Sequence, residues 1–254
     1  MSQANLENPP PRGATAEREA RDRAKPHAQI VLLRHGEPQW SVGDGPSVSD
    51  PELTPFGVWQ AEASARTLAA EHEFDALYVS PYRRARETAA PLVKATGLEP
   101  VTVDPLAEVG VAVEGFSSEE ADRYFVEGSR RPLKEHWDGW PGSETFHDFH
   151  GRVTAGITDI LARHGCHSFR EHDFTTWKLP EAKPKIAIVA HMGTNAVILT
   201  HLLDIRPVPW EWLRFETGLA AYSILQARPI GPEGYVWSLL QFDREDHLIQ
   251  AGLR

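Results

Sequence analysis

The sequence predicts an α/β fold, a three-layer α/β/α sandwich around a mostly parallel central sheet. From Gln29 onward, short apolar runs rich in β-branched residues alternate with longer segments of helical periodicity, which is typical of strands joined by crossover helices. The 254 residues, 41% of them hydrophobic, suffice for a sizeable core. We expect one domain over residues 28–254. Residues 1–27, which are polar and contain three consecutive prolines, are expected to form a flexible tail.

The first half of the domain contains three expected strands: QIVLL (29–33), DALYV (75–79) and PVTV (100–103). Thr54, followed by a proline, predicts a capped helix that ends near residue 72. Ser80, also followed by a proline, predicts a second capped helix that ends near residue 96. Residues 41–52 are rich in Gly, Pro, Ser and Asp and are expected to form a surface loop.

In the second half, Ser143 is expected to cap a helix with one apolar stripe. The stripe consists of Phe146, Phe149, Val153, Ile157, Ile160 and Leu161. KIAIVA (185–190) predicts a buried strand, followed directly by a helix over about 194–203. Two late strands are expected near 220–227 and 235–242, on either side of a PIGPEG turn.

Composition argues against several classes of protein. A net charge of −10 with scattered basic residues disfavours binding to nucleic acid. The apolar runs are too short to span a bilayer, and the N-terminus lacks the apolar stretch of a signal peptide. The one cysteine, Cys166, excludes an internal disulfide framework. We therefore expect a cytoplasmic protein with neither a membrane nor a nucleic acid as partner.

The tripeptide Arg-His-Gly occurs twice, in different contexts. The first copy, residues 34–36, directly follows a predicted strand, where open α/β sheets place their ligand crevice. The second copy, residues 163–165, lies at the end of the striped helix. There Arg163 and His164 complement the helix dipole, and Gly165 suits the left-handed residue that closes a helix. The first copy is thus the candidate for chemistry.

Other chemically competent residues follow strand ends as well. They are Arg83, Arg84 and Arg86, then Glu108, and then His191. If the strands share one sheet, these residues converge on its carboxyl edge. Guanidinium groups bind phosphate oxygens, a neutral imidazole is a nucleophile toward phosphorus, and a carboxyl group can protonate a leaving alcohol. With no cluster of oxygen ligands visible, we expect neither a metal nor another cofactor.

Six segments, in order, resemble motifs of the histidine phosphatase superfamily with phosphoglycerate mutase-like architecture. They are LLRHGEPQW (32–40), LTPFGVWQA (53–61), SPYRRARETA (80–89), PLAE (105–108), PGSET (141–145) and VAHMG (189–193). The resemblance covers about Gln29 to Leu248. Six motifs in the family's order are far more specific than any one of them.

The resemblance implies a role for each candidate residue. His35 would be phosphorylated, with Arg34, Arg84 and His191 around the phosphate. Glu108 would act as general acid and then as general base, although Glu114 is a rival in the same segment.

Three positions depart from the family's pattern. Pro38 stands where threonine is customary, Ser41 stands in the place of an asparagine, and Met192 replaces a glycine. Substrate choice is expected to differ accordingly.

The leading hypothesis is a phosphomonoester phosphatase that acts on a small phosphorylated metabolite through a phosphohistidine. The rivals are phosphoglycerate mutase-type transfer and a non-catalytic phosphate-binding module. The long insertion of the mutases is not recognisable, and the intact set of candidate residues disfavours a binding module. The substrate depends on residues 41–52 and 109–142 and is not determined by the motifs. Whether two copies form a homodimer also stays open.

Overall fold

The structure, a computed structural model, describes residues 27–40, 45–171, 173–231 and 234–254. Apart from His27, the predicted tail over residues 1–27 lies outside the described residues. So do the start of the predicted loop at 41–52 and two residues of the predicted PIGPEG turn.

The described strands form one eight-stranded sheet in the order β3-β2-β6-β1-β7-β8-β5-β4. The strands are β1 (Gln29–Arg34), β2 (Ala76–Val79), β3 (Pro100–Thr102), β4 (His167–Glu171), β5 (Phe174–Lys178), β6 (Lys185–Ala190), β7 (Tyr222–Pro229) and β8 (Tyr235–Arg244). Pairing is parallel from β3 to β1 and antiparallel from β1 to β4. The predicted α/β class is confirmed, with the expected parallel pairing confined to one half of a mixed sheet.

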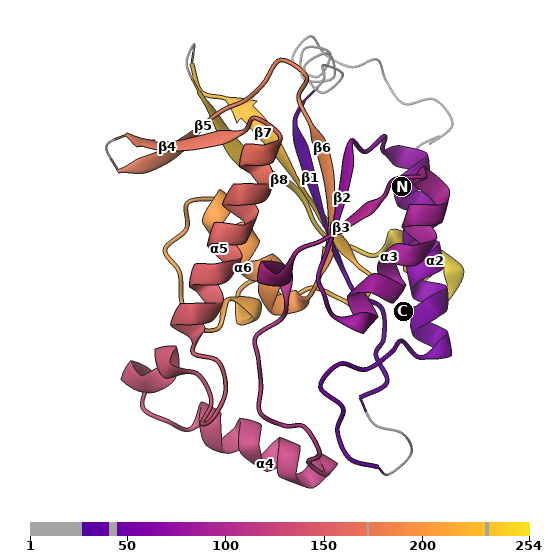
Figure 1. Ribbon diagram of the computed structural model, residues 1–254, viewed down its shortest axis with the longest axis vertical. Helices are drawn as coiled ribbons and strands as arrows, with labels where there is room; N and C mark the ends of the chain where they lie inside the picture. Colours follow the sequence, from indigo (N-terminus) through magenta and orange to yellow (C-terminus); the bar gives the residue numbers. More distant parts are fainter. Residues whose placement is uncertain (1–26, 41–44, 172, 232–233) are drawn as a thin grey trace, which may run out of the picture.

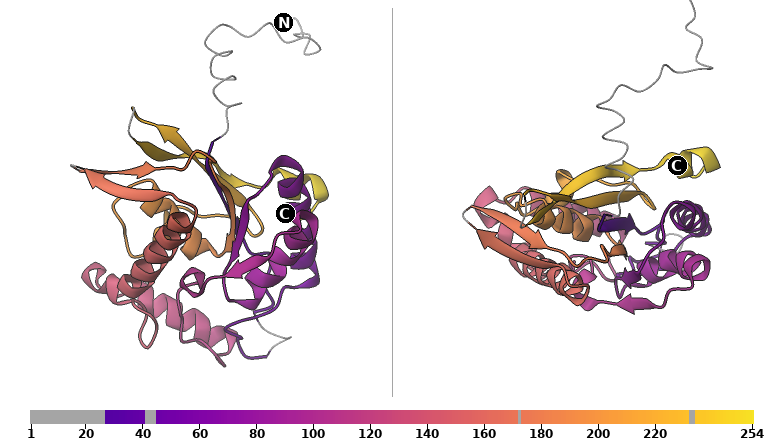
Figure 2. Two further views of the ribbon diagram at one scale, coloured as in Figure 1. Left: turned by 45° about the horizontal axis from the view of Figure 1, so that its top comes forward. Right: turned by 90° about the horizontal axis from the view of Figure 1, so that it is seen from above.

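Helices cover both faces of this sheet. They are α2 (Pro55–Glu71), α3 (Arg83–Thr96), α4 (Ser118–Ser129), α5 (Phe146–Arg163), α6 (Met192–Leu202) and α7 (Asp246–Ala251), with 3-10 turns η1 (Asp104–Leu106), η2 (Leu133–Asp138) and η3 (Glu211–Leu213). Figures 1 and 2 show α5 and α6 against one face and α2 and α3 against the other. This arrangement gives the three predicted layers.

Alternation along β1 divides the core between the two faces. Ile30 and Leu32 belong to the cluster that contains the α5 stripe, whereas Val31 and Leu33 belong to the cluster under α2 and α3. Because β1 is buried on both faces, its sequence is continuously apolar. The polar residues at its end therefore emerge from the middle of the core.

One predicted helix cap is present and two are wrong. Thr54 accepts a hydrogen bond from the Gly57 amide at the start of α2, as predicted. Helix α3, however, begins at Arg83 without a side-chain cap, so Ser80 lies outside it. Helix α5 is capped by Thr145. The predicted cap, Ser143, instead accepts a hydrogen bond from the amide of Ala112.

Several elements escaped the sequence interpretation: α4, α7, β4 and β5. Helix α4 has no buried residue, and the sequence analysis missed the capping box that Ser117 and Glu120 form at its start. Figure 1 shows α4 beyond the sheet edge at which β1 and β6 end. The segment before it contacts the loop after β1, since the Ser47 amide donates to the Phe116 carbonyl (2.7 Å). Within the described residues, no helix has the length and apolar character needed to cross a membrane.

Candidate active site

Two buried histidines meet at the carboxyl ends of neighbouring parallel strands. His35 follows β1 and His191 follows β6, and the His35 amide donates to the Ala190 carbonyl (3.0 Å). The centroids of the two imidazole rings are 5.1 Å apart. His35 is 4% exposed and His191 is completely buried. The parallel half of the sheet thus positions both rings.

The hydrogen bond of His35 determines which ring nitrogen is free. Its Nδ1 lies 2.8 Å from the carbonyl oxygen of Gly36. A carbonyl oxygen only accepts, so Nδ1 carries the proton and Nε2 keeps its lone pair. Burial holds the pKa of His35 well below its ordinary value, and the Arg84 guanidinium lowers it further, against the opposing effect of the Gly36 carbonyl. The ring is therefore a neutral imidazole with a nucleophilic Nε2.

Gly36 lets this loop approach the α2 backbone. A Cβ atom at this position would lie 2.5 Å from the Gly57 carbonyl oxygen, so a side chain would push the loop away. The Gly36 amide donates to the hydroxyl of Thr88 on α3 (3.0 Å). The glycine of the first Arg-His-Gly copy thus allows the loop after β1 to pack directly against the backbone of α2.

The second Arg-His-Gly copy closes α5, as predicted. Arg163 is the last helical residue and pairs with Asp159, one turn earlier. His164 Nε2 lies 2.9 Å from the Tyr78 hydroxyl, and Gly165 has a left-handed φ of 73°. None of these contacts includes a residue of the site at the ends of β1 and β6.

His191 is held by a residue that sequence reasoning interpreted as a helix cap. Ser80 Oγ lies 2.6 Å from His191 Nε2. The other ring nitrogen, Nδ1, is buried and has no hydrogen-bond partner among the described residues. Burial, followed by the neighbouring His35 and Arg84, lowers the pKa of His191 well below its ordinary value. Only the position of Ser80 immediately after a buried strand could have signalled this role.

Two arginines flank the histidines. Arg34 donates from Nη1 to the Thr217 carbonyl, and this nitrogen also lies 3.6 Å from the sulfur of Met192. Arg84 is 2% exposed, with its guanidinium over the rings of Trp40 and Tyr82. Each arginine has a buried Nε without a hydrogen-bond partner in the described part of the chain. Burial lowers the pKa of each guanidinium, while the Glu108 carboxylate opposes this shift.

The two rival arginines next to Arg84 lie outside the site. Arg83 is exposed and pairs with Glu52 and Glu87, and Arg86 is also exposed. The structure therefore brings only Arg84 of these three to the histidines.

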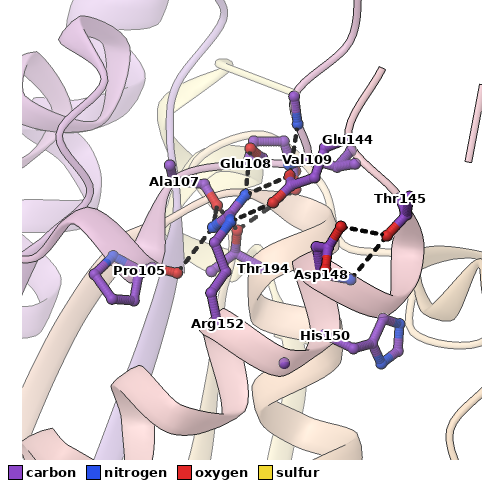
Figure 3. Close-up of polar contacts among 12 residues, drawn as sticks. Pro105, Ala107, Glu108, Val109, Glu144, Thr145, Asp148, His150, Arg152 and Thr194 are labelled. Carbon is purple, nitrogen blue, oxygen red and sulfur yellow. Dashed lines mark hydrogen bonds and ion pairs between the residues drawn. The ribbon is translucent and has the colours of Figure 1, made fainter. Parts of the chain in front are cut away.

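Glu108, unlike Glu114, faces the start of α6. Its carboxylate accepts from the Gly193 amide (2.9 Å) and lies 3.4 Å from the Thr194 hydroxyl (Figure 3). Its charge acts on both Arg34 and Arg84. Glu114 is exposed and accepts from the Ser49 amide.

Of the three positions that depart from the family's pattern, Pro38 and Met192 belong to the described residues, and Met192 contacts Arg34 through its sulfur. Pro38 forms an isolated antiparallel bridge with Leu53. Ser41 lies outside the described residues.

Within the described chain, no three His, Cys, Asp or Glu side chains form a group that could hold a metal ion.

The family model "Histidine phosphatase superfamily (branch 1)" matches residues 30–239. The chain belongs to this superfamily. The match spans both histidines, both arginines and Glu108, so the predicted family is confirmed. The roles of the individual site residues remain predictions.

Two curated relatives match about half of the chain. The Bifunctional protein Rv2228c of Mycobacterium tuberculosis is 34% identical over 139 residues, which are 52% of this chain but only 37% of that protein. A 2,3-bisphosphoglycerate-dependent phosphoglycerate mutase of Azorhizobium caulinodans is 30% identical over 131 residues, covering 49% of this chain and 64% of the mutase.

A solved structure covers more of the chain. It is that of mycobacterial glucosyl-3-phosphoglycerate phosphatase Rv2419c in complex with VO3, at 25% identity and a TM-score of 0.62. The alignment covers 85% of this chain and 98% of that one.

Proposed function

We propose that this histidine phosphatase superfamily member is a phosphomonoester phosphatase that works through a phosphohistidine on His35. One observation carries the proposal: a neutral imidazole with a free Nε2 lies among Arg34, Arg84 and His191, with the Glu108 carboxyl group nearby. Nucleophile, anion-binding donors and acid are the components that phosphoryl transfer needs.

In the first step, His35 Nε2 attacks the phosphorus of the bound ester. The bond between phosphorus and the leaving oxygen breaks as the new N–P bond forms. Protonated Glu108 gives its proton to the leaving alcohol. Arg34 and Arg84 stabilise the charge on the transferring phosphoryl oxygens.

In the second step, the Glu108 carboxylate removes a proton from water, and the resulting hydroxide oxygen attacks phosphorus. The N–P bond breaks, inorganic phosphate leaves, and His35 returns to its neutral form. His191 contributes to both steps when Ser80 donates its hydroxyl proton to Nε2, because the ring proton then lies on Nδ1 and can be donated to a phosphate oxygen.

The test is hydrolysis of p-nitrophenyl phosphate in the presence of EDTA. We expect turnover by the wild type and its nearly complete loss in His35→Ala, with no acid-labile phosphoenzyme trapped on that variant. His164→Ala, which alters the second Arg-His-Gly copy, is the matched control and should turn over almost normally. Unchanged activity in His35→Ala would refute the proposed mechanism.

Phosphoglycerate mutase-type transfer is the second candidate, favoured by the mutase relative at 30% identity. It uses the same phosphohistidine but returns the phosphoryl group to a second hydroxyl of the substrate. Incubation with 3-phosphoglycerate and 2,3-bisphosphoglycerate distinguishes the two, since formation of 2-phosphoglycerate faster than release of phosphate would reverse our ranking.

The proposed substrate is a small phosphorylated metabolite, which we expect to contact the loop after β1 and the segment after Glu108. The hydrogen bonds between Ser47 and Phe116, and between Gly115 and Ser47, connect these two segments. Cytoplasmic location and the lack of nucleic acid binding remain predictions from the sequence, which leaves open whether two copies form a homodimer.

A further inference from the structure

Arg152, on the side of α5 that faces the Glu108 loop, uses all five of its N–H donors. Nε and Nη2 donate to the two carboxylate oxygens of Glu144, at 2.6 and 2.8 Å. The remaining donors reach the main-chain carbonyls of Pro105 (3.0 Å), Ala107 (2.8 Å) and Glu108 (3.0 Å). Figure 3 shows the guanidinium surrounded by these acceptors. No donor of Arg152 is left for a phosphate oxygen.

This bonding differs from that of the other two arginines near the histidines. Arg34 and Arg84 each keep a buried Nε without a partner among the described residues. Arg152 is instead bonded entirely to protein, and mostly to the backbone of one loop. A planar fork of five donors can hold three carbonyls and a carboxylate in one fixed arrangement, which an ammonium group cannot do. Arg152 therefore stabilises the loop that contains Glu108.

Glu144 extends the same support past Glu108. Its Oε2 also accepts from the Gly110 amide (2.9 Å), and its own amide donates to the Gly110 carbonyl (2.9 Å). The main chain is thus held from Pro105 to Gly110, on both sides of Glu108. The Thr194 hydroxyl, from α6, adds a bond to the Ala107 carbonyl (3.0 Å).

We propose that the Arg152–Glu144 pair is a positioning device that fixes the Glu108 backbone so that its carboxyl group reaches the leaving oxygen. The proposal rests on the proposed phosphatase function and deepens it. The device acts on the proton transfer through Glu108 and contributes no contact to the phosphoryl group. Loss of the device should therefore harm the departure of poor leaving groups most, since these depend on protonation.

The experiment compares kcat/KM for phenyl phosphate and p-nitrophenyl phosphate, which share a phosphoryl group but differ in leaving-group basicity. This parameter reports the steps up to departure of the phenol. In Arg152→Leu and Arg152→Lys, we expect roughly a 100-fold loss with phenyl phosphate and a loss below about 10-fold with p-nitrophenyl phosphate. A general loss of folded protein would lower both values equally.

Arg152→Lys keeps the positive charge but removes the five planar N–H donors of the guanidinium. If lysine restores the wild-type ratio of the two substrates, charge alone suffices and the proposed device is refuted. Glu144→Gln leaves Arg152 in place and should change the ratio in the same direction, so the result does not depend on the folding of the Arg152 variants. Arg163→Lys, at an exposed arginine of the same helix, is the matched control and should keep the wild-type ratio.

Glu108→Gln distinguishes failure of this inference from failure of the proposed function. If Glu108→Gln keeps the wild-type ratio, Glu108 is not the acid and the proposed mechanism fails. If Glu108→Gln changes the ratio but folded Arg152→Lys and Glu144→Gln do not, only the positioning role is refuted.

Discussion

Ser80 Oγ lies 2.6 Å from Nε2 of His191, and both side chains are completely buried. The Ser80 hydroxyl also lies 3.3 Å from the Tyr82 amide, which donates to it. In the proposed mechanism this hydroxyl donates its proton to Nε2, which fixes the orientation of the ring and places the ring proton on Nδ1.

Ser80→Ala should therefore lower kcat/KM for p-nitrophenyl phosphate roughly 10-fold, the effect of losing one hydrogen bond of about 1 to 1.5 kcal/mol. The control is Ser64→Ala, because Ser64 is another completely buried serine, and its hydroxyl lies 2.9 Å from His247 Nε2. It should lose stability but keep kcat/KM. Equal activity losses in the two variants would mean that the Ser80 bond is only structural.

Gly193→Ala tests how tightly the start of α6 holds the Glu108 carboxylate. A Cβ atom at this position would lie 2.5 Å from Glu108 Oε1, so the carboxylate must move. Alanine favours a helix, and the clash is with the end of a flexible side chain, so the fold should persist. We expect an unchanged melting temperature and a kcat/KM for phenyl phosphate that falls about 10-fold or more. Wild-type kinetics would show that the carboxylate position is not critical.

Neighbouring arginines on α3 offer a direct comparison. Arg84→Ala removes a buried guanidinium beside His35 and should lower kcat/KM on the order of 100-fold. Arg83→Ala removes only an exposed side chain paired with Glu52 and Glu87 and should leave activity nearly unchanged. Inorganic phosphate, measured as a competitive inhibitor, should bind more weakly to the first variant alone. The reverse order would mean that the phosphate site involves Arg83.

Stability should decrease as the pH falls through the ordinary histidine pKa. Among the described residues, seven histidines have lowered pKa values, mainly through burial: His35, His72, His150, His164, His191, His201 and His247. Below a pH of about 6.5, the unfolded chain binds protons at these rings and the folded chain binds fewer, so the free energy of unfolding falls. We expect a lower melting temperature at pH 5.5 than at pH 7.5. The drop should be smaller in His191→Gln, and an equal drop would contradict the argument.

Sequence patterns predicted the residues that follow buried strands. His35 and His191 each directly follow a buried strand, so their position at the carboxyl ends of the strands follows from the strands alone. The apolar stripe likewise predicted α5 correctly. These elements were visible because burial on a sheet face imposes a regular pattern on the sequence.

The supporting residues carry no such pattern. Arg152 bonds main-chain atoms more than forty positions away, and Ser80 bonds His191, 111 positions away. Contacts of this kind depend on the assembled fold. Helix α4 was also missed, although Ser117 and Glu120 form a capping box at its start. Ser143 was predicted as the cap of α5, but Thr145 has Asp148 three positions further on and exchanges hydrogen bonds with it, whereas Ser143 accepts from the Ala112 amide.

The acceptors that Arg152 holds in the Glu108 loop are main-chain carbonyl oxygens, which every amino acid has. Substitutions at Ala107 or Val109 therefore leave these acceptors in place. The side chains next to Glu108 can change, and with them the shape and polarity presented to a substrate, while the carboxyl group keeps its location. Because main-chain contacts hold Glu108 whatever side chains flank it, substitutions beside it can alter substrate specificity while the general acid stays in place.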